Sequence, residues 1–209
     1  MIIAICGLIG SGKDTIADYL VNVHQFRRDS FAASLKDAVS AVFGWDRELL
    51  EGRTRYSREW REQVDSWWAQ RLGIADLTPR WVLQHWGTEV LRRGFHEDIW
   101  VASIENKLRT SPDDIVISDC RFPNEVAALR RAGGHVIRVI RGAEPEWWAW
   151  AQNSPEIMPE LFPQVHASEW SWAATEFDRL VYNNGTMDEL YSQVNDLVRD
   201  LRDARADRS

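Results

Sequence analysis

The chain has 209 residues, 44% of them hydrophobic, which suits one domain with its own core or a domain with an inserted lid. The formal net charge of −7 disfavours a DNA or RNA polymer as the main partner, because an acidic protein repels a polyanion through its overall field. No apolar run approaches the length of a membrane span, and no basic region precedes the first strand-like run. We therefore expect no membrane segment and no signal peptide, and a cytoplasmic protein.

Apolar runs alternate with segments of helical period, which is typical of an α/β fold with a mainly parallel sheet. In chain order the pattern predicts a strand at 2–6, a helix at 13–24, a short strand near 27–31, helices at 33–43, 57–72, 79–93 and 97–109, a strand at 115–119, a helix at 123–132, a strand at 135–141, a strand at 180–182 and a helix at 186–203. Residues 142–177 are rich in Trp, Pro, Glu and Ser and lack one clear period, so we interpret them as a lid or insertion. Residues 203–209 are expected to fray.

Cysteine and tryptophan both have a structural explanation. Cys6 and Cys120 lie in apolar runs without metal-ligand spacing, so we expect two reduced core residues. Of the twelve tryptophans, Trp60, Trp67 and Trp68 follow a helical stripe, which favours packing over a base-stacking surface.

The strongest motif is Gly-x-x-x-x-Gly-Lys, which follows the first predicted strand and opens the first predicted helix. Its glycines allow backbone N–H groups to surround phosphate oxygens, and the helix directs its positive end at the same anion. Lys13 can reach the β- and γ-phosphates. The stretch Gly7 to Thr15 is therefore predicted to hold a nucleotide. It carries Asp14 where a hydroxyl often binds Mg²⁺, so either Thr15 substitutes or the metal is held mostly through water.

Two further clusters lie on predicted helices. Ser34 and Lys36 begin the helix at 33–43, where a second phosphate could bind, although Lys36 also fits an ordinary surface lysine. Arg80, Gln84 and Thr88 recur every four residues and so project together, either to read a base edge and its phosphate or as a solvated face.

A third cluster follows a buried strand. Asp119 lies at the sheet edge where α/β proteins bind ligands and could hold Mg²⁺ through water. Arg121 could clamp a phosphate with Glu125 orienting it, and a structural ion pair is the alternative. Arg141 ends the next predicted strand, and the Asn183-Asn184-Gly185 turn fits either a tolerated positive φ or an adenine pocket.

Together these features resemble the deoxynucleoside monophosphate kinases of tailed phages, within the P-loop nucleoside-monophosphate kinase superfamily. The matching stretches run in the order of that family: GLIGSGKDTIADYL (7–20), FAASLKDAV (31–39), LQHWGTEVL (83–91), Asp-Ile-Trp (98–100), ISDCRFPNEVAALRRAGGHVIRVIR (117–141), HASE (166–169) and DRLVYNNGTMDEL (178–190). The Asp14-Thr15 pair, unusual among phosphate loops in general, is usual in this family.

The resemblance implies one three-layer P-loop kinase domain over 1–209, with a mainly parallel sheet, a helical acceptor-binding region at about 45–110 and a lid at about 142–177. It implies transfer of the γ-phosphoryl group of ATP to a deoxynucleoside monophosphate (dNMP), with Mg²⁺, for phage DNA precursor supply in the host cytoplasm, by a monomer or homodimer. The implied ATP-binding residues are Gly10, Ser11, Gly12, Lys13, Asp14, Thr15 and Asn183. The implied acceptor residues are Lys36, Arg80, Gln84, Thr88, Trp100, Arg121 and Glu125. The implied catalytic residues are Lys13, Asp119, Arg121 and Arg141, with Asp119 and Thr15 toward the metal.

Alternative functions remain open at this point. The acceptor could be dephospho-coenzyme A or a modified base within DNA, although the acidic balance disfavours DNA. A nucleotide-binding switch that signals through a partner is the alternative outside the kinases, and the second cationic cluster around Lys36 and Arg121 disfavours it. The accepted base and the choice between deoxyribose and ribose are not readable from the residues, and region 45–78 is least like the family.

Overall fold

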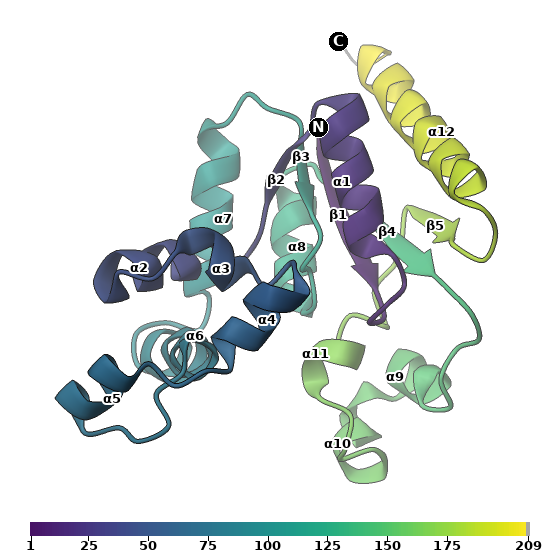
Figure 1. Cartoon of the computed structure of the whole chain (residues 1–209). Coiled ribbons are helices and arrows are strands. Elements are labelled where there is room, and N and C mark those ends of the chain that lie inside the picture. Colours follow the sequence, from purple (N-terminus) through teal and green to yellow (C-terminus); the bar gives the residue numbers. More distant parts are fainter. Residues whose placement is uncertain (208–209) are drawn as a thin grey trace. The chain divides into compact units, whose positions relative to one another are not determined.

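The computed structural model describes residues 1–207, and its chain forms two compact units (Figure 1). The sheet unit comprises residues 1–30 and the chain from Lys107 onward, and the helical unit comprises Phe31–Asn106.

A five-stranded sheet, with β1 (Ile2–Gly7) at its centre, organises the sheet unit. The order is β2-β3-β1-β4-β5, and every pair is parallel. The other strands are β2 (Arg27–Asp29), β3 (Ile115–Ile117), β4 (His135–Ile140) and β5 (Arg179–Tyr182). The predicted parallel α/β sheet is confirmed. The strand predicted over 115–119 ends earlier, because its ladders with β1 and β2 stop at Ile117.

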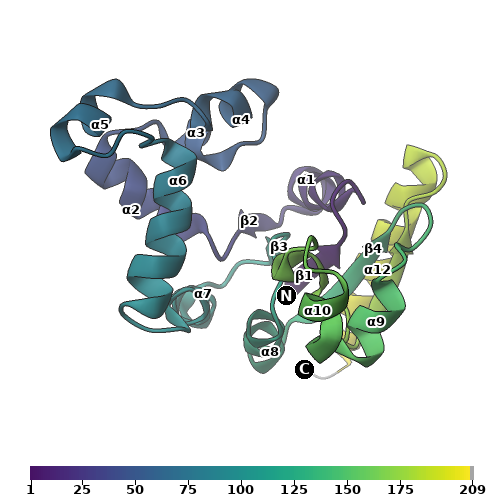
Figure 2. The same cartoon turned by 90° about the horizontal axis from the view of Figure 1, so that it is seen from below.

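Helices cover both faces of this sheet (Figure 2). The helices α1 (Lys13–His24) and α12 (Met187–Ala206) share a core with alternate strand residues such as Ile3, Ile5 and Val139, whereas α8 (Pro123–Arg131) lies on the opposite face. This arrangement gives the expected three layers. The α12 helix continues to Ala206, beyond the predicted end at 203, and Arg205 in its last turn pairs with Asp114 at 3.5 Å. Both cysteines are free and buried, as expected.

The segment 142–177 belongs to the sheet unit and folds into short turns of helix. These are α9 (Trp148–Asn153), the 3₁₀ turn η2 (Pro155–Ile157), α10 (Met158–Leu161) and α11 (Ala167–Trp170). Trp148, Met158 and Trp172 are buried within it. Arg138 of β4 places its guanidinium 3.6 Å from the centroid of a Trp148 ring and pairs with Glu144, so the segment is attached to the sheet near its start.

The helical unit packs aromatic and aliphatic side chains from six short helices. They are α2 (Ala33–Phe43), α3 (Arg47–Glu51), α4 (Arg55–Arg61), α5 (Ser66–Leu72), α6 (Pro79–Gln84) and the π-helix η1 (His85–Arg93), followed by α7 (Ile99–Thr110), which continues past the unit's end. Phe43 stacks on Trp45 with ring centroids 4.4 Å apart, in a core that includes Leu50, Val82 and Trp100. Packing therefore accounts for most of the tryptophans in this unit.

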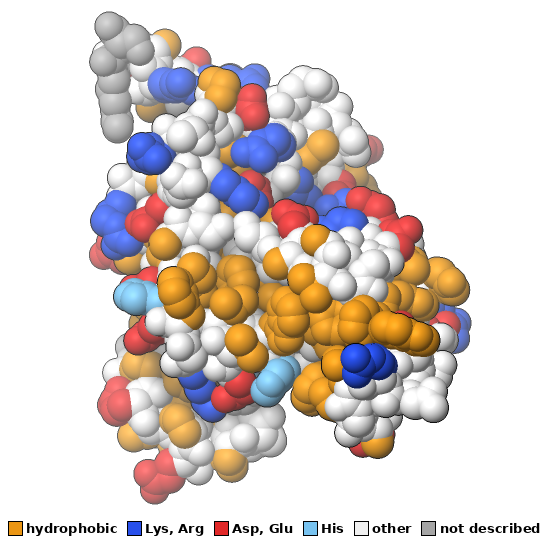
Figure 3. All heavy atoms as spheres, turned by 90° about the vertical axis from the view of Figure 1, so that its left-hand side faces the viewer, with side chains coloured by type: hydrophobic (Ala, Val, Ile, Leu, Met, Phe, Trp, Pro, Cys, Tyr) orange, Lys and Arg blue, Asp and Glu red, His pale blue; other side chains and the backbone are white. Residues whose placement is uncertain are grey.

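One predicted helix of this unit, over 57–72, is wrong as a single element. Asp65 accepts hydrogen bonds from the backbone N–H groups of Trp67 and Trp68 and so begins a separate helix, α5. The break removes Trp67 from the expected stripe and leaves it 61% exposed. Figure 3, which draws one face of the molecule, shows hydrophobic side chains gathered in a band across that face.

The helix predicted over 79–93 also changes character, since it continues from His85 as a π-helix. Gly87 approaches Leu35 closely, and its carbonyl accepts a hydrogen bond from the Trp100 indole N–H at 3.0 Å. A π-helix bonds residue i to i+5, so its turn is wider than that of an α-helix, and residues four apart remain close on its surface. The face predicted for Arg80, Gln84 and Thr88 therefore runs across the junction of α6 and η1. Among the helices of residues 1–207, none has both the length and the apolar character needed to cross a membrane.

Candidate active site

The phosphate loop has the predicted context, with β1 ending at Gly7 and α1 beginning at Lys13. Gly10 and Gly12 have φ angles of 77° and 104°, a region in which side chains other than glycine are strained. Gly12 precedes α1 and has no side chain to cap it, so the first N–H groups of the helix face the loop. These features are typical of an anion-binding site at a helix N-terminus.

Lys13 turns back over this loop. Its Nζ donates to the carbonyl oxygens of Gly7 and Leu8 at 2.7 and 2.8 Å. Burial lowers the pKa of Lys13 from its ordinary 10.5, the neighbouring charge of Arg121 lowers the pKa further, and Asp14 and Glu169 oppose both effects. Lys13 and Arg121 therefore share one electrostatic environment in the sheet unit.

Asp14 and Thr15 lie in the first turn of α1. The Asp14 carboxylate accepts a hydrogen bond from Arg28 of β2, which also donates to Asp18 at 2.8 Å and to Ser118 at 2.7 Å. The charge of Asp14 is thus compensated by an arginine of β2, the edge strand of the sheet. Ser11 has a buried hydroxyl oxygen without a hydrogen-bond partner in residues 1–207, and Thr15 is half-buried.

Asp119 and Arg121 follow β3 at the carboxyl edge of the sheet. Because Ile117 pairs with Ala4, this connection runs beside the end of β1 from which the phosphate loop starts. The Glu125 side chain accepts from the backbone N–H groups of Arg121 and Phe122 at 2.8 and 3.2 Å. Glu125 is buried and holds the backbone of this connection at the start of α8.

Arg141 and Asn183 reach the phosphate loop from the other side. Arg141 donates to the Gly10 carbonyl at 3.4 Å, and the Asn183 amide donates to the Ser11 carbonyl at 2.8 Å. The loop, Asp119, Arg121, Arg141 and Asn183 all follow strands at one edge of the sheet unit, where parallel sheets bind ligands.

The remaining predicted site residues belong to the helical unit. Lys36 pairs with Glu51 at 2.7 Å and Arg80 with Glu62 at 3.2 Å, while Gln84 and Thr88 are exposed. Trp100 is 7% exposed and its N–H is bonded to Gly87, so its ring belongs to the core of this unit.

Sequence reasoning assigned no role to Arg28, Glu51, Ser168 and Glu169. The HASE stretch at 166–169 can be recognised in the sequence. Its contact with Arg121 joins residues far apart in the chain, so only the structure reveals it. Arg28 and Glu51 could be found only from their ion pairs with Asp14 and Lys36.

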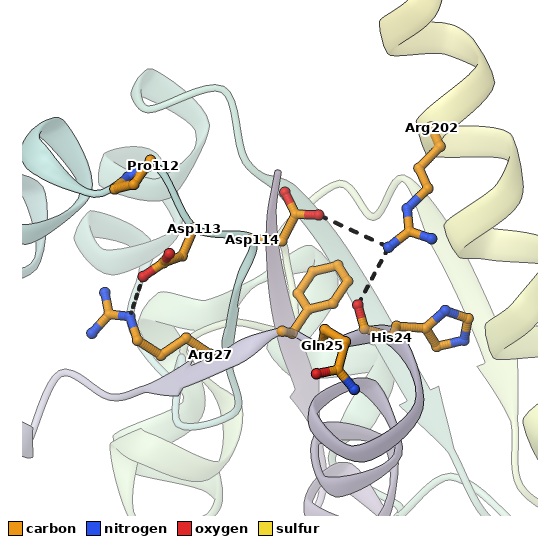
Figure 4. A pocket seen from close by; sticks show the side chains of 8 residues that line it. His24, Gln25, Arg27, Pro112, Asp113, Asp114 and Arg202 are labelled. Atoms are coloured by element: carbon orange, nitrogen blue, oxygen red, sulfur yellow. Dashed lines mark hydrogen bonds and ion pairs between the residues drawn. The ribbon is translucent and has the colours of Figure 1, made fainter.

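A pocket of about 530 Å³ lies elsewhere in the sheet unit, beside the amino ends of β2 and β3 (Figure 4). Arg202 spans Asp114 and the His24 carbonyl there, and Arg27 pairs with Asp113. None of the predicted site residues lines it.

Comparison with known proteins identifies the family. The model of the family described as "Deoxynucleotide monophosphate kinase" matches residues 72–194. A relative in Acanthamoeba polyphaga mimivirus, which carries the same family name, is 30% identical over 207 residues, covering 93% of this chain and 94% of that protein. The chain belongs to the deoxynucleotide monophosphate kinase family. The resemblance inferred from the sequence is confirmed, and so is the assignment to the kinases.

The chain is also similar to a phage enzyme and to a solved kinase structure. The deoxynucleoside-5′-monophosphate kinase of Escherichia phage T5 is 29% identical over 179 residues, covering 62% of this chain and 72% of that protein. Among solved structures, a shikimate kinase from Aquifex aeolicus vf5 is 11% identical, with a TM-score of 0.45 over 99% of each chain. The α/β fold assignment rests on the sheet order and phosphate loop described above, because that TM-score is low.

Proposed function

We propose that this enzyme transfers the γ-phosphoryl group of ATP to a dNMP and releases ADP and a deoxynucleoside diphosphate. The observation that carries the proposal is the joint placement of the phosphate loop, Lys13 and Arg121 at one sheet edge in a chain of this family. An acceptor monophosphate has a second pKa of about 6, so it is largely dianionic at neutral pH and needs no general base. The residues are required mainly to position two nucleotides and to stabilise charge on the transferred group.

The ATP site is proposed to be the phosphate loop with its supports. Backbone N–H groups from Gly10 to Thr15 would surround the phosphates, and Lys13 would exchange its carbonyl contacts for phosphate oxygens. Asn183 supports the loop through Ser11, and Arg141 lies beside Gly10. Arg141 would add charge near the transferred group, and the turn after Asn183 would lie near adenine.

Mg²⁺ is proposed to bind beside the phosphates, with Asp119 and Thr15 as its protein partners through water. Residues 1–207 contain no group of three His, Cys, Asp or Glu side chains that could hold a metal ion. This fits Mg²⁺, which keeps several waters and takes substrate phosphates as ligands alongside one or two carboxylates. When bound, the ion would neutralise charge on the phosphates.

The acceptor residues are proposed to be Lys36, Arg80, Gln84, Thr88, Trp100, Arg121 and Glu125. Lys36 and Arg121 would meet the monophosphate, Gln84 and Thr88 the base, and Trp100 would shape the region from within its core. Glu125 would act by fixing the backbone that carries Arg121. We also propose the single-domain organisation with a lid at 142–177. We also propose a role in the cytoplasm of an infected cell, which the viral and phage origin of the relatives supports. The proposed assembly is a monomer or homodimer, with no nucleic acid polymer as partner.

The test is an acceptor panel. The protein is incubated with ATP, Mg²⁺ and each common dNMP, ribonucleoside monophosphate or dephospho-coenzyme A, and the phosphorylated product is quantified by chromatography. We expect diphosphates from one or more dNMPs and lower yields from ribonucleotides. Product only from dephospho-coenzyme A, or from no acceptor, would refute the proposal.

A further inference from the structure

The short helix α11 brings a hydroxyl and a carboxylate to Arg121. Arg121 Nη1 lies 3.4 Å from Ser168 Oγ and 3.5 Å from Glu169 Oε1. The Glu169 side chain is 22% exposed, so this pair is partly shielded from water. An anionic group from the 142–177 segment thus contacts the arginine proposed to handle phosphate.

Local contacts hold Glu169 in this position. His166 accepts from the backbone N–H of Ser168 at 3.2 Å and caps α11, and the Trp170 indole donates to the Val165 carbonyl at 3.3 Å. Trp172, just beyond the helix, is fully buried. Glu169 therefore projects from a packed turn, which lowers the entropy cost of its contact with Arg121.

The charge of Glu169 also acts on the phosphate loop. The pKa of Lys13 is lowered first by burial and then by Arg121, and Glu169 is among the anions that oppose this. Two like charges near one site cost free energy unless an anion lies close to both. Bound nucleotide would supply that anion through its phosphate oxygens.

We propose that the Glu169 carboxylate is a stand-in for a nucleotide phosphate, which keeps Arg121 beside Lys13 in the free enzyme and is displaced when nucleotide binds. The inference rests on the proposed function, and it assigns the HASE stretch (166–169) the role of holding Arg121. Glu169 is a positioning residue, acting through Arg121. It has two opposed effects: it stabilises the free site, and it weakens nucleotide affinity because its charge repels the incoming phosphates.

The experiment compares Glu169→Gln with wild type by isothermal titration of MgADP and of MgATP without acceptor. We expect the Kd of the variant to be lower by about three- to tenfold at low salt, as for removal of one like charge from a partly shielded site. The difference should shrink as salt screens the site. Glu169→Asp keeps the charge and should restore wild-type affinity, and Glu160→Gln, an exposed site in the same segment, should leave it unchanged.

The sign of the effect decides the inference. A carboxylate that is merely structural would leave the Kd unchanged or raised when neutralised, and either result overturns the proposal. Glu169→Ala provides a second neutral variant with the same expected direction if the Gln variant does not fold. Failure of the wild type to bind either nucleotide would instead refute the proposed function, and this inference with it.

Discussion

Arg28 forms an ion pair with Asp14, the residue that stands where a phosphate loop commonly carries a hydroxyl. A bare carboxylate in the first turn of α1 would repel the phosphates that the loop is built to bind. Arg28 comes from the edge strand β2 and also binds Asp18 and Ser118, so it offsets this charge from a fixed position. The unusual residue of the motif thus has its compensation in the fold.

Arg28→Gln is expected to weaken MgATP binding by about fivefold, or about 1 kcal/mol, because the Asp14 charge is then uncompensated. Adding Asp14→Asn should recover most of the loss. The Kd values for MgATP of wild type, both single variants and the double variant form a double-mutant cycle. Arg71→Gln, at an exposed position, is the control. Additive losses in the double variant would contradict a charge-compensation role.

Asn183→Ala is expected to lower MgATP affinity by about fivefold, since the Ser11 carbonyl loses a hydrogen bond worth about 1 kcal/mol that fixes the loop. Equilibrium titration of the variant measures this loss. Asn22→Ala, at an exposed position near the end of α1, controls for removal of an amide. Wild-type affinity in the Asn183 variant would show that the loop does not need this support.

The sequence predicts the phosphate loop and the parallel sheet well, because their signals are local: glycine spacing, a preceding apolar run and a following helix. The break at Asp65 was missed because apolar periodicity continues across it, and only the N-cap hydrogen bonds show that a new helix begins there. The π-helix at 85–93 was missed because the residues that contact Gly87 within it, Leu35 and Trp100, belong to other helices, and periodicity along the chain does not show them. Glu169 was missed for the same reason, since its partner Arg121 is 48 positions away.

Glu51→Gln is expected to reduce the loss of unfolding free energy that the helical unit shows as the pH falls below neutral. Burial alone would raise the pKa of Glu51, but hydrogen bonds and charges from Lys36 and Arg47 hold it at about 2, below the ordinary 4.5. A depressed carboxyl pKa stabilises the folded state above the unfolded pKa, so this contribution is present above pH 4.5 and is lost as pH falls toward about 2.

Urea unfolding followed by circular dichroism between pH 7 and pH 2 measures this dependence. The variant should be less stable than wild type by about 1 kcal/mol at pH 7 and equal to it near pH 2. Glu48→Gln, on the same short helix α3, serves as the control. A constant difference between variant and wild type at all pH values would contradict the ion-pair assignment.

Arg138→Met is expected to destabilise the 142–177 segment by about 2 kcal/mol, because it removes the cation–π contact with Trp148 and leaves Glu144 without its partner. Arg138→Lys should recover only part of the loss, since an ammonium lacks the flat face that stacks on the ring. Tryptophan fluorescence during unfolding and limited proteolysis of the segment report the change. Unaltered protease resistance in the Met variant would show that Arg138 does not anchor the segment.

The most direct test of the proposed activity follows the fate of the γ-phosphoryl group itself. The protein is incubated with γ-labelled ATP, Mg²⁺ and an equimolar mixture of the four common dNMPs, and the label is traced by chromatography. The proposed kinase activity predicts label in deoxynucleoside diphosphate, in equal amount to the ADP formed, and loss of that product in Lys13→Ala with the fold intact. Label released as inorganic phosphate alone, or label transfer that persists in Lys13→Ala at the wild-type rate, would contradict it.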